Sequence, residues 1–268
     1  MGVIFYLMES IKLIYKEGHG PSSSHTMGPY KAAQMFKVKH PQVSAFRVTL
    51  CGSLAATGKG HLTDKAIYDG LAPASVEIVW RPDIVHDFHT NGMIFEALDD
   101  RGASVDTWTI YSIGGGYLAP VPVSDSQPPL YPHSKMRDIL SFIENNGLTF
   151  WEYVEMHEGD SIWDYLSRMW AIMQSTVEEG LLTDSVLPGE LHLRSKARQY
   201  YVRASSFKPS LQSRALVIAY ALATAERNAA GSQIVTAPTC GSSGVLPAVL
   251  KKKKKNHGFQ DKEILKAM

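Results

Sequence analysis

The N-terminal part of the chain alternates apolar and polar residues with the two-residue period of β-strands. In residues 43–52, every second side chain from Phe46 onward is apolar, which predicts a strand with one buried face. Residues 75–80 show a similar pattern. The apolar stretches 93–98 and 103–113 are separated by a turn that carries Asp and Gly, so they predict a β-hairpin.

A helical pattern lies between the first two of these strands. In residues 55–71, Ile67 and Leu71 are four residues apart, and Thr63 stands where a residue could cap the start of a helix. Together with the strands, this helix predicts a small α+β domain over residues 26–113.

The second half of the chain has the longer period of amphipathic helices. Residues 161–182 carry apolar side chains at three- and four-residue spacing, and Gly180 predicts the end of that helix. The repeated apolar positions are Ile162, Leu166, Met169, Met173 and Val177. Residues 209–231 are apolar nearly all round, which predicts a helix at the centre of a helical domain. Residues 244–258 and 261–268 predict two more helices.

Residues 119–134 are rich in proline and serine and form the clearest linker in the sequence. The fold class is therefore α+β: a small α+β domain over residues 1–118, a linker over 119–140, and a mainly helical domain over 141–268. The last helix has no cap and no partner in the pattern, so we expect the helical domain to be incomplete.

Charge and composition indicate a globular protein that functions through a localised binding or catalytic site. The electrostatic field of its overall charge is too weak to determine its function. The 27 Lys and Arg residues nearly balance the 26 Asp and Glu residues, so we expect no nucleic-acid partner. The Lys251–Lys255 run fits a solvated helix end. The sequence contains no membrane-length apolar run and no signal peptide, which predicts a cytoplasmic protein without a membrane partner. Cys51 and Cys240 are expected to be reduced thiols.

The segment "GHGPSSSHTMGP", residues 18–29, places hydroxyl side chains and a histidine between two glycine–proline pairs. One interpretation is an ordinary polar turn that caps a helix. The other starts from Pro29, which suits the first position of a helix. Free N–H groups of that helix would then point at the loop Ser22–Thr26 and bind a carboxylate or phosphate. These residues alone leave both interpretations open.

The segment "NAAGSQIVTAPTCGSSGVLPAVL", residues 228–250, places Cys240 in a glycine- and serine-rich turn before a predicted helix. A thiol at a helix N-terminus has a lowered pKa and serves as a nucleophile or metal ligand. The alternative is a small buried cysteine in a tight turn. No histidine has a partner four residues on to form a helical zinc pair, so most histidines are expected to lie on the surface or to be satisfied. This holds for His61, His86, His89 and His192.

Five segments in this order resemble the iron–sulfur-dependent bacterial L-serine dehydratases. They are "GHGPSSSHTMGPYKAA", "GSLAATGKGH", "YSIGGGYL", "VLPGELHLRSKA" and "NAAGSQIVTAPTCGSSGVLPAVL". The resemblance implies an N-terminal β domain, a helical α domain with a [4Fe-4S] cluster, and a substrate site between them. It further implies conversion of L-serine to pyruvate and ammonia without pyridoxal phosphate, with an iron of the cluster acting as a Lewis acid on the substrate hydroxyl.

The resemblance also implies roles for individual residues. His25 would be the general base, with Ser24 and Thr26 beside it as catalytic residues. The residues implied to bind substrate are Ser22, Ser23, Thr239, Gly241 and Ser242. Cys240 would be a cluster ligand.

The sequence departs from the family pattern at two positions and in its cysteine content. Many relatives have cysteine where this chain has Ser243 and asparagine where it has Cys240. A cluster of this kind needs about three or more thiolates, and the chain offers one candidate. We therefore expect a truncated enzyme that works as a homo-oligomer or with a complementing chain. The alternative is a non-catalytic amino-acid-binding or regulatory fragment.

Overall fold

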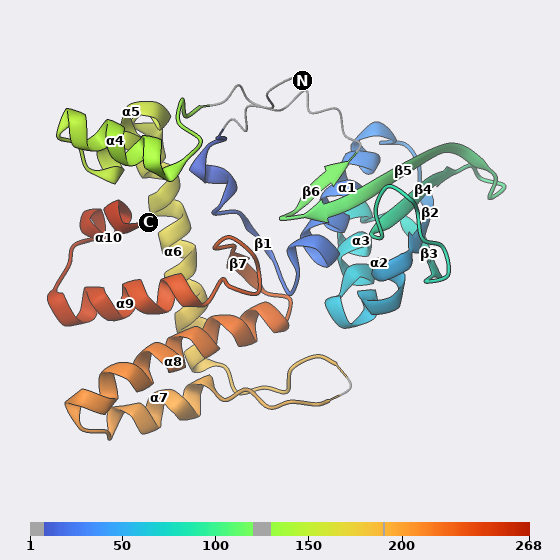
Figure 1. Cartoon of the computed structure of the whole chain (residues 1–268). Coiled ribbons are helices and arrows are strands. Elements are labelled where there is room, and N and C mark those ends of the chain that lie inside the picture. The colour runs from blue at the N-terminus through green and yellow to red at the C-terminus, as the bar shows by residue number, and fades with distance from the viewer. Residues whose placement is uncertain (1–7, 120–129, 190) are drawn as a thin grey trace.

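The computed structural model describes residues 8–119, 130–189 and 191–268, which form two regions side by side (Figure 1). The sheet region comprises residues 20–119. The helical region comprises residues 130–189 and 191–268 together with the N-terminal segment 8–19. The predicted α+β class is confirmed, because a mixed sheet is followed by a helical part.

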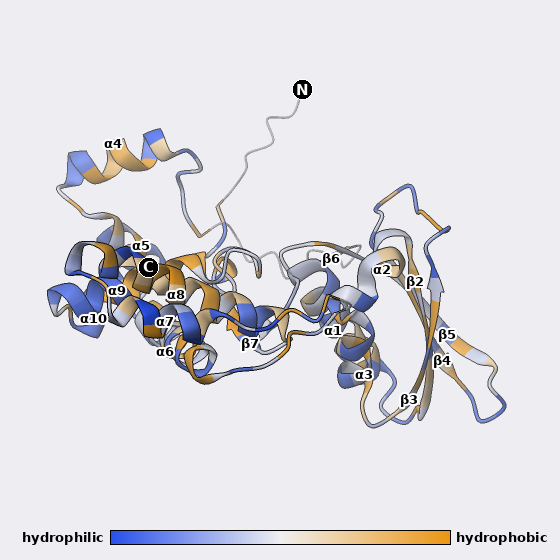
Figure 2. Ribbon diagram, turned by 90° about the horizontal axis from the view of Figure 1, so that it is seen from below, coloured by the Kyte–Doolittle hydropathy of each residue, from blue (hydrophilic) through white to orange (hydrophobic). Residues whose placement is uncertain are grey.

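A mixed five-stranded sheet dominates the sheet region, with the order β3-β2-β4-β5-β6. Strands β2 and β3 are parallel, and the other neighbouring pairs are antiparallel. The elements are η2 (Ser23–Met27), α1 (Gly28–Lys39), β2 (Ala45–Cys51), α2 (Gly52–Thr57), η3 (Gly58–His61), α3 (Thr63–Leu71), β3 (Ser75–Arg81), β4 (Gly92–Leu98), β5 (Ser104–Gly114) and β6 (Tyr117–Ala119). Helices α1 and α3 lie between the sheet and the helical region (Figure 2).

The predicted strands and hairpin are confirmed. Phe46, Val48 and Leu50 of β2 are all buried on one face, as the alternation requires. They pack against Phe36 of α1 and Phe95 of β4 in one continuous core. Burying this apolar face is what fixes the register of the sheet.

The helical region is built around the long helix α6, whose predicted apolar positions are all buried. Its helices are α4 (Met136–Asn146), α5 (Phe150–Glu158), α6 (Ser161–Leu182), α7 (Ala197–Ser205), α8 (Pro209–Ala229), α9 (Val245–His257) and α10 (Asp261–Ala267). The prediction that Gly180 ends α6 is wrong, because the helix continues to Leu182. Gly180 instead lets α6 approach α8, since a side chain there would overlap the backbone of Ala223.

Helix α8 is less central than its composition predicts. Leu216 and Tyr220 are buried, whereas Leu211 and Ile218 are 58% and 50% exposed. The small side chains of α8 pack closely against α6 and α7 on one side, and the other side of the helix remains open.

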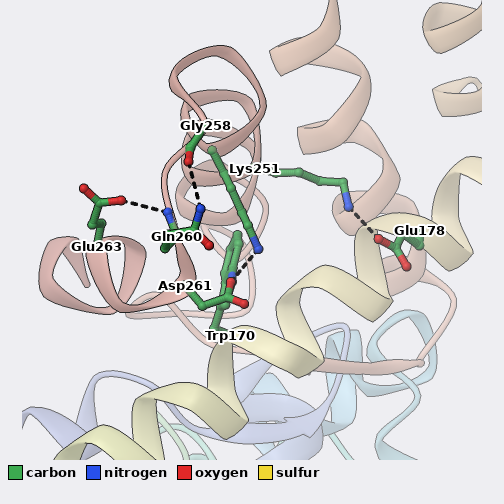
Figure 3. A network of polar contacts seen from close by, with 8 residues as sticks. Trp170, Glu178, Lys251, Gly258, Gln260, Asp261 and Glu263 are labelled. Atoms are coloured by element: carbon green, nitrogen blue, oxygen red, sulfur yellow. Dashed lines mark hydrogen bonds and ion pairs between the residues drawn. The ribbon is translucent and has the colours of Figure 1, made fainter.

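The lysine run of α9 takes part in ion pairs with its neighbours. Lys251 Nζ lies 2.7 Å from Glu178 of α6 (Figure 3). Lys254 Nζ lies 2.5 Å from Asp261 of α10. The indole N–H of Trp170 also donates to Asp261, at 3.0 Å (Figure 3). Lys251 and Lys254 therefore link α9 to α6 and α10. The prediction of a solvated helix end fits only part of the run.

The N-terminal segment packs against the helical region and connects it to the sheet region. After the short helix η1 (Ile11–Leu13), Tyr15 is buried in the core around α6. Strand β1 (Glu17–His19) then pairs antiparallel with β7 (Gln233–Val235). The chain passes from there into the sheet region, so residues next to β1 lie at the junction of the two regions.

The division of the chain at residues 118 and 140 remains a prediction, and residues 120–129 of the predicted linker lie outside the described residues. Within the described part of the chain, no helix has both the length and the apolar content needed to cross a bilayer.

Candidate active site

The serine-rich segment lies where the two regions meet. The N–H of Gly20 donates to the carbonyl oxygen of Ser232 at 3.1 Å, next to β7. The amide nitrogen of Asn228, on α8, donates to the carbonyl oxygen of Pro21 at 3.1 Å. Gly20 packs so closely on Asn228 that any side chain at residue 20 would overlap it. The helical region therefore holds the start of this segment in place.

The segment is itself helical, which corrects the expectation of a loop facing a helix that starts at Pro29. Residues Ser23–Met27 form a π-helical turn that runs directly into α1. The carbonyl oxygen of Ser22 accepts hydrogen bonds from the N–H groups of Thr26 and Met27, at 2.9 and 3.1 Å. The Ser22 hydroxyl caps the turn by accepting from the N–H of His25 at 3.1 Å. The helix therefore starts one turn earlier, and its N-terminus carries the serines.

Hydroxyl groups on both sides hold the imidazole of His25. Its Nδ1 lies 2.9 Å from Ser24 Oγ, and its Nε2 lies 3.2 Å from Ser53 Oγ, at the start of α2. Burial, assisted by the nearby ring of His61, lowers the pKa of His25 below its ordinary value. His25 is therefore a neutral imidazole at pH 7, the form that can accept a proton.

His61 is a second imidazole at this site, and the sequence analysis missed its role. Its ring centroid lies 4.7 Å from that of His25. His61 Nδ1 lies 2.9 Å from the carbonyl oxygen of Thr57, which can only accept, so Nδ1 carries a proton. The histidine at the end of "GSLAATGKGH" is the signal in the sequence that could have pointed to this role. No residue-spacing motif pairs it with His25, because the two histidines are far apart in sequence.

Two threonines fix the backbone around this histidine pair. Thr26 Oγ1 donates to the carbonyl oxygen of His61 at 2.7 Å, and Thr63 Oγ1 donates to that of His25 at 2.5 Å. Thr63 was expected to cap a helix. It is instead the first residue of α3, preceded by Leu62, and its hydroxyl links α3 to the histidine turn. Thr26 is buried and fully engaged, since its Oγ1 also accepts from the N–H of Ser22 at 3.2 Å.

The remaining predicted site residues lie in a turn between β7 and α9. Thr239 Oγ1 and Ser242 Oγ are 3.0 Å apart, and Ser242 Oγ donates to the carbonyl oxygen of Ala237 at 2.8 Å. Gly241 lies between them and is exposed. The thiol of Cys240 contacts the Met27 sulfur at 3.5 Å, which brings this turn against the serine-rich turn.

Cys240 does not have the lowered pKa that its predicted position at a helix N-terminus implies. Helix α9 starts only at Val245, and Cys240 is 2% exposed beneath the turn. Burial raises its pKa to about 12. In the free chain Cys240 is therefore a protonated buried thiol, in agreement with the alternative interpretation.

The side chains at this site do not by themselves fit an iron–sulfur cluster. Among residues 8–119, 130–189 and 191–268, no group of three or more His, Cys, Asp or Glu side chains is placed to hold a metal. Cys240 is the one thiol at the junction, because Cys51 is buried at the end of β2 in the sheet core. A cluster needs about three or more thiolates.

Comparison with known proteins gives the family. The model of the serine dehydratase beta chain matches residues 10–79, and that of the serine dehydratase alpha chain matches residues 50–268. The chain is 33% identical to the L-serine dehydratase of Haemophilus influenzae, over 91% of this chain and 66% of that protein. It is 33% identical to the L-serine dehydratase of Streptomyces coelicolor, over 88% and 64%, and 32% identical to L-serine dehydratase 2 of Escherichia coli, over 91% and 65%.

The chain thus spans about two thirds of the length of these curated relatives. The matches to the two family models together extend over residues 10–268, which include both the serine-rich turn and the Cys240 turn. The chain belongs to the serine dehydratase family.

Proposed function

We propose that this chain takes part in the dehydration and deamination of L-serine to pyruvate and ammonia, with its substrate site at the junction of the two regions. The observation that carries the proposal is the pair of imidazoles, His25 and His61, whose ring centroids lie 4.7 Å apart at this junction. Hydroxyl groups from three segments surround the pair.

The first step of this reaction is removal of the proton on Cα of serine. A neutral imidazole is suited to it, and general bases of this kind contribute about 10²–10⁴-fold to a rate. Loss of the β-hydroxyl then leaves aminoacrylate, which tautomerises to an imine. Hydrolysis of the imine gives pyruvate and ammonia. We assign the proton transfer to the His25–His61 pair.

The other predicted residues take roles that follow from their contacts. Ser24 orients His25 at Nδ1, and Ser53 orients it at Nε2. Thr26 acts as a positioning residue because its buried hydroxyl is engaged by His61 and Ser22. Ser22 and Ser23 form the start of the turn. We place them near the substrate carboxylate, where N–H groups at a helix start favour an anion.

The turn after β7 forms the opposite side of the proposed site. The Thr239 and Ser242 hydroxyls are hydrogen-bonded to each other there, and the exposed Gly241 adds no side chain beside them. Cys240, beneath this turn, contacts the serine-rich turn through Met27.

We propose a [4Fe-4S] cluster, without pyridoxal phosphate, as the cofactor of the active enzyme. Cys240 is the candidate ligand in this chain, and the other thiolates would come from a polypeptide segment that residues 1–268 do not contain or from a complementing chain, since Cys51 is the other cysteine of the sequence. When bound, the cluster would supply a Lewis acid for the departing hydroxide. We propose a homo-oligomeric or two-chain enzyme that works in the cytoplasm.

The test is pyruvate formation from L-serine after anaerobic reconstitution with iron and sulfide. His25→Ala and His61→Ala should each lower the rate by about 10²-fold or more. His257→Ala is the matched control, because His257 is exposed at the end of α9, and it should keep the full rate. If both site variants keep the wild-type rate, the assignment of proton transfer to this pair is wrong.

The alternative function is amino-acid binding without catalysis. The buried thiol and the lack of a metal-binding group among the described residues favour it for the chain on its own. A reconstituted protein that stays colourless, forms no pyruvate and still binds L-serine would support this alternative over the dehydratase.

A further inference from the structure

A large cleft lies beside the candidate active site. Its volume is about 1160 Å³, somewhat more than typical small-molecule pockets. Helices α1 and α3 form one wall and α6 the other, and β1 lies between them (Figure 1). Thr26 and Met27 line the cleft as well as belonging to the serine-rich turn. The cleft is therefore distinct from the candidate active site, but the serine-rich turn borders both.

The wall formed by the sheet region and β1 is positively charged. Lys16, Lys31 and Lys65 line it, together with two carboxylates, Asp69 and Glu17 of β1. Within the described part of the chain, Lys16, Lys31, Lys65 and Asp69 form no ion pair with an N···O distance of 4.0 Å or less, whereas Glu17 pairs with Arg168. The wall therefore carries an excess of positive charge.

The other carboxylates of the cleft are neutralised locally. Glu17 pairs with Arg168 and accepts a hydrogen bond from the Gln233 amide at 2.5 Å. Glu179 pairs with Arg227 at 2.9 Å. These acids are thus not available to balance the lysines across the cleft.

Lys16 is held in a fixed position at the wall. Its Nζ donates to the carbonyl oxygen of Gly115 at 2.8 Å and lies 3.5 Å from the centre of the Tyr117 ring. The side chain is half-buried, and burial together with repulsion from Lys31 lowers its pKa to about 8, against a weaker opposing effect of Glu9. A half-buried cation that is repelled by a neighbouring lysine is stabilised by a bound anion.

We infer that this cleft binds a small dianion, a phosphomonoester or a dicarboxylate, through Lys16, Lys31 and Lys65. Because Glu17 and Glu179 are paired with arginines, the three lysines face one carboxylate without an ion pair, Asp69, and match a ligand with two negative charges. Zwitterionic serine, which has no net charge, does not match them. The inference does not rest on the proposed dehydratase activity, although a ligand here would touch the turn that carries His25.

The first test uses the reactivity of Lys16 toward an acylating reagent at pH 8, followed by mass spectrometry. Glycerol 3-phosphate and succinate serve as the phosphomonoester and dicarboxylate probes, and potassium chloride at equal ionic strength is the control. A bound dianion should cover Lys16 and favour its protonated form, so that acylation slows several-fold with the matching probe. Acylation of Lys39, which pairs with Asp106 outside the cleft, should not change.

The pattern of protection identifies the ligand class. Protection by glycerol 3-phosphate alone identifies a phosphomonoester site, and protection by succinate alone identifies a dicarboxylate site. Equal acylation of Lys16 in both probes and in potassium chloride would overturn the inference. This measurement needs no turnover, so it can succeed or fail independently of the dehydratase proposal.

A second test measures the affinity for the protecting probe by calorimetry. Lys31→Gln should weaken binding by about tenfold, as expected for losing one charge-assisted contact. Lys39→Gln is the matched control and should bind like the wild type. Unchanged affinity in Lys31→Gln would contradict the assignment of this wall.

Discussion

The sheet region and the helical region differ in how they bury their apolar side chains. One continuous core joins α1, α2 and α3 to the sheet. In the helical region the buried apolar residues of the described part form three clusters, two of which are bridged by the partly buried Ile11 and Val154. Apolar side chains of α8 and α9 also remain open to solvent there, with Val245 62% and Ile218 50% exposed.

The polar chemistry is divided in the same way. Among the described residues, the hydrogen bonds that fix His25 and His61 come from the sheet region, through Ser24, Ser53 and Thr63 among others. The helical region contributes Asn228, which donates to Pro21, and Cys240, which contacts Met27 of the serine-rich turn. The comparison teaches that the sheet region builds the histidine site, whereas the helical region anchors it and forms its far side.

The largest effect is expected for the thiol on the helical side. With the pKa of Cys240 raised to about 12, its thiolate fraction at pH 8 is about a thousandfold below that of an ordinary cysteine. Alkylation of Cys240 by iodoacetamide in a Cys51→Ser background should be slower by about that factor, and urea should restore the ordinary rate. Rapid alkylation of the folded chain would place Cys240 at an activated, accessible position instead.

Phe36→Ala tests the continuous core of the sheet region. Phe36 is 1% exposed and packs on Phe46 and Phe95, so its removal should cost about 3–5 kcal/mol of unfolding free energy. Val38→Ala, at a position 79% exposed, should change stability by less than about 0.5 kcal/mol. Urea denaturation measures both. Similar losses in the two variants would contradict the single core.

Gly180→Ala tests the close contact of α6 with α8. The added methyl group would overlap the Ala223 backbone and should cost about 1–3 kcal/mol. Gly60→Ala is the matched control, because a methyl group at Gly60 would meet no atom within 4 Å. If thermal denaturation gives both variants the same midpoint, the two helices do not touch at this glycine.

The smallest effect is the pH dependence that His25 contributes. Because the folded pKa of His25 lies below its ordinary 6.5, the unfolded chain binds more protons at this residue as the pH falls below 6.5. The stability from the neutral ring is complete above that pH and is lost as the pH falls through the folded pKa. From about pH 7 to about pH 5, His25→Asn should therefore lose less stability than the wild type. If urea titrations show that the wild type and His25→Asn lose the same unfolding free energy over this pH range, the pKa of His25 is not lowered by burial.

The strands and the central helix could be predicted because their signals are local. Phe46 to Leu50 alternate, and Ile162 to Val177 recur at helical spacing, so burial of one face determines both. The prediction that Gly180 ends a helix fails because sequence spacing does not reveal which helix lies next to it. Glycine is favoured at this position because α8 approaches α6 closely there.

The site was less predictable because it depends on contacts between distant segments. The composition of the serine-rich segment predicts that it belongs to the site. Its helical form depends on hydrogen bonds from the N–H groups of Thr26 and Met27 to the Ser22 carbonyl oxygen. The pairing of His25 with His61 requires η3 to pack beside η2. The raised pKa of Cys240 comes from burial, which a glycine-rich sequence does not predict.

The central claim is that the histidine pair at the junction of the two regions binds L-serine. The most direct measurement follows the imidazole NMR signals of the protein during a titration with L-serine, with each signal assigned from a single histidine variant. We predict saturable shifts of the His25 and His61 signals, while the signal of the distant His257 stays in place. If the His25 and His61 signals do not move while another part of the protein responds to L-serine, the substrate site lies elsewhere and the account is wrong.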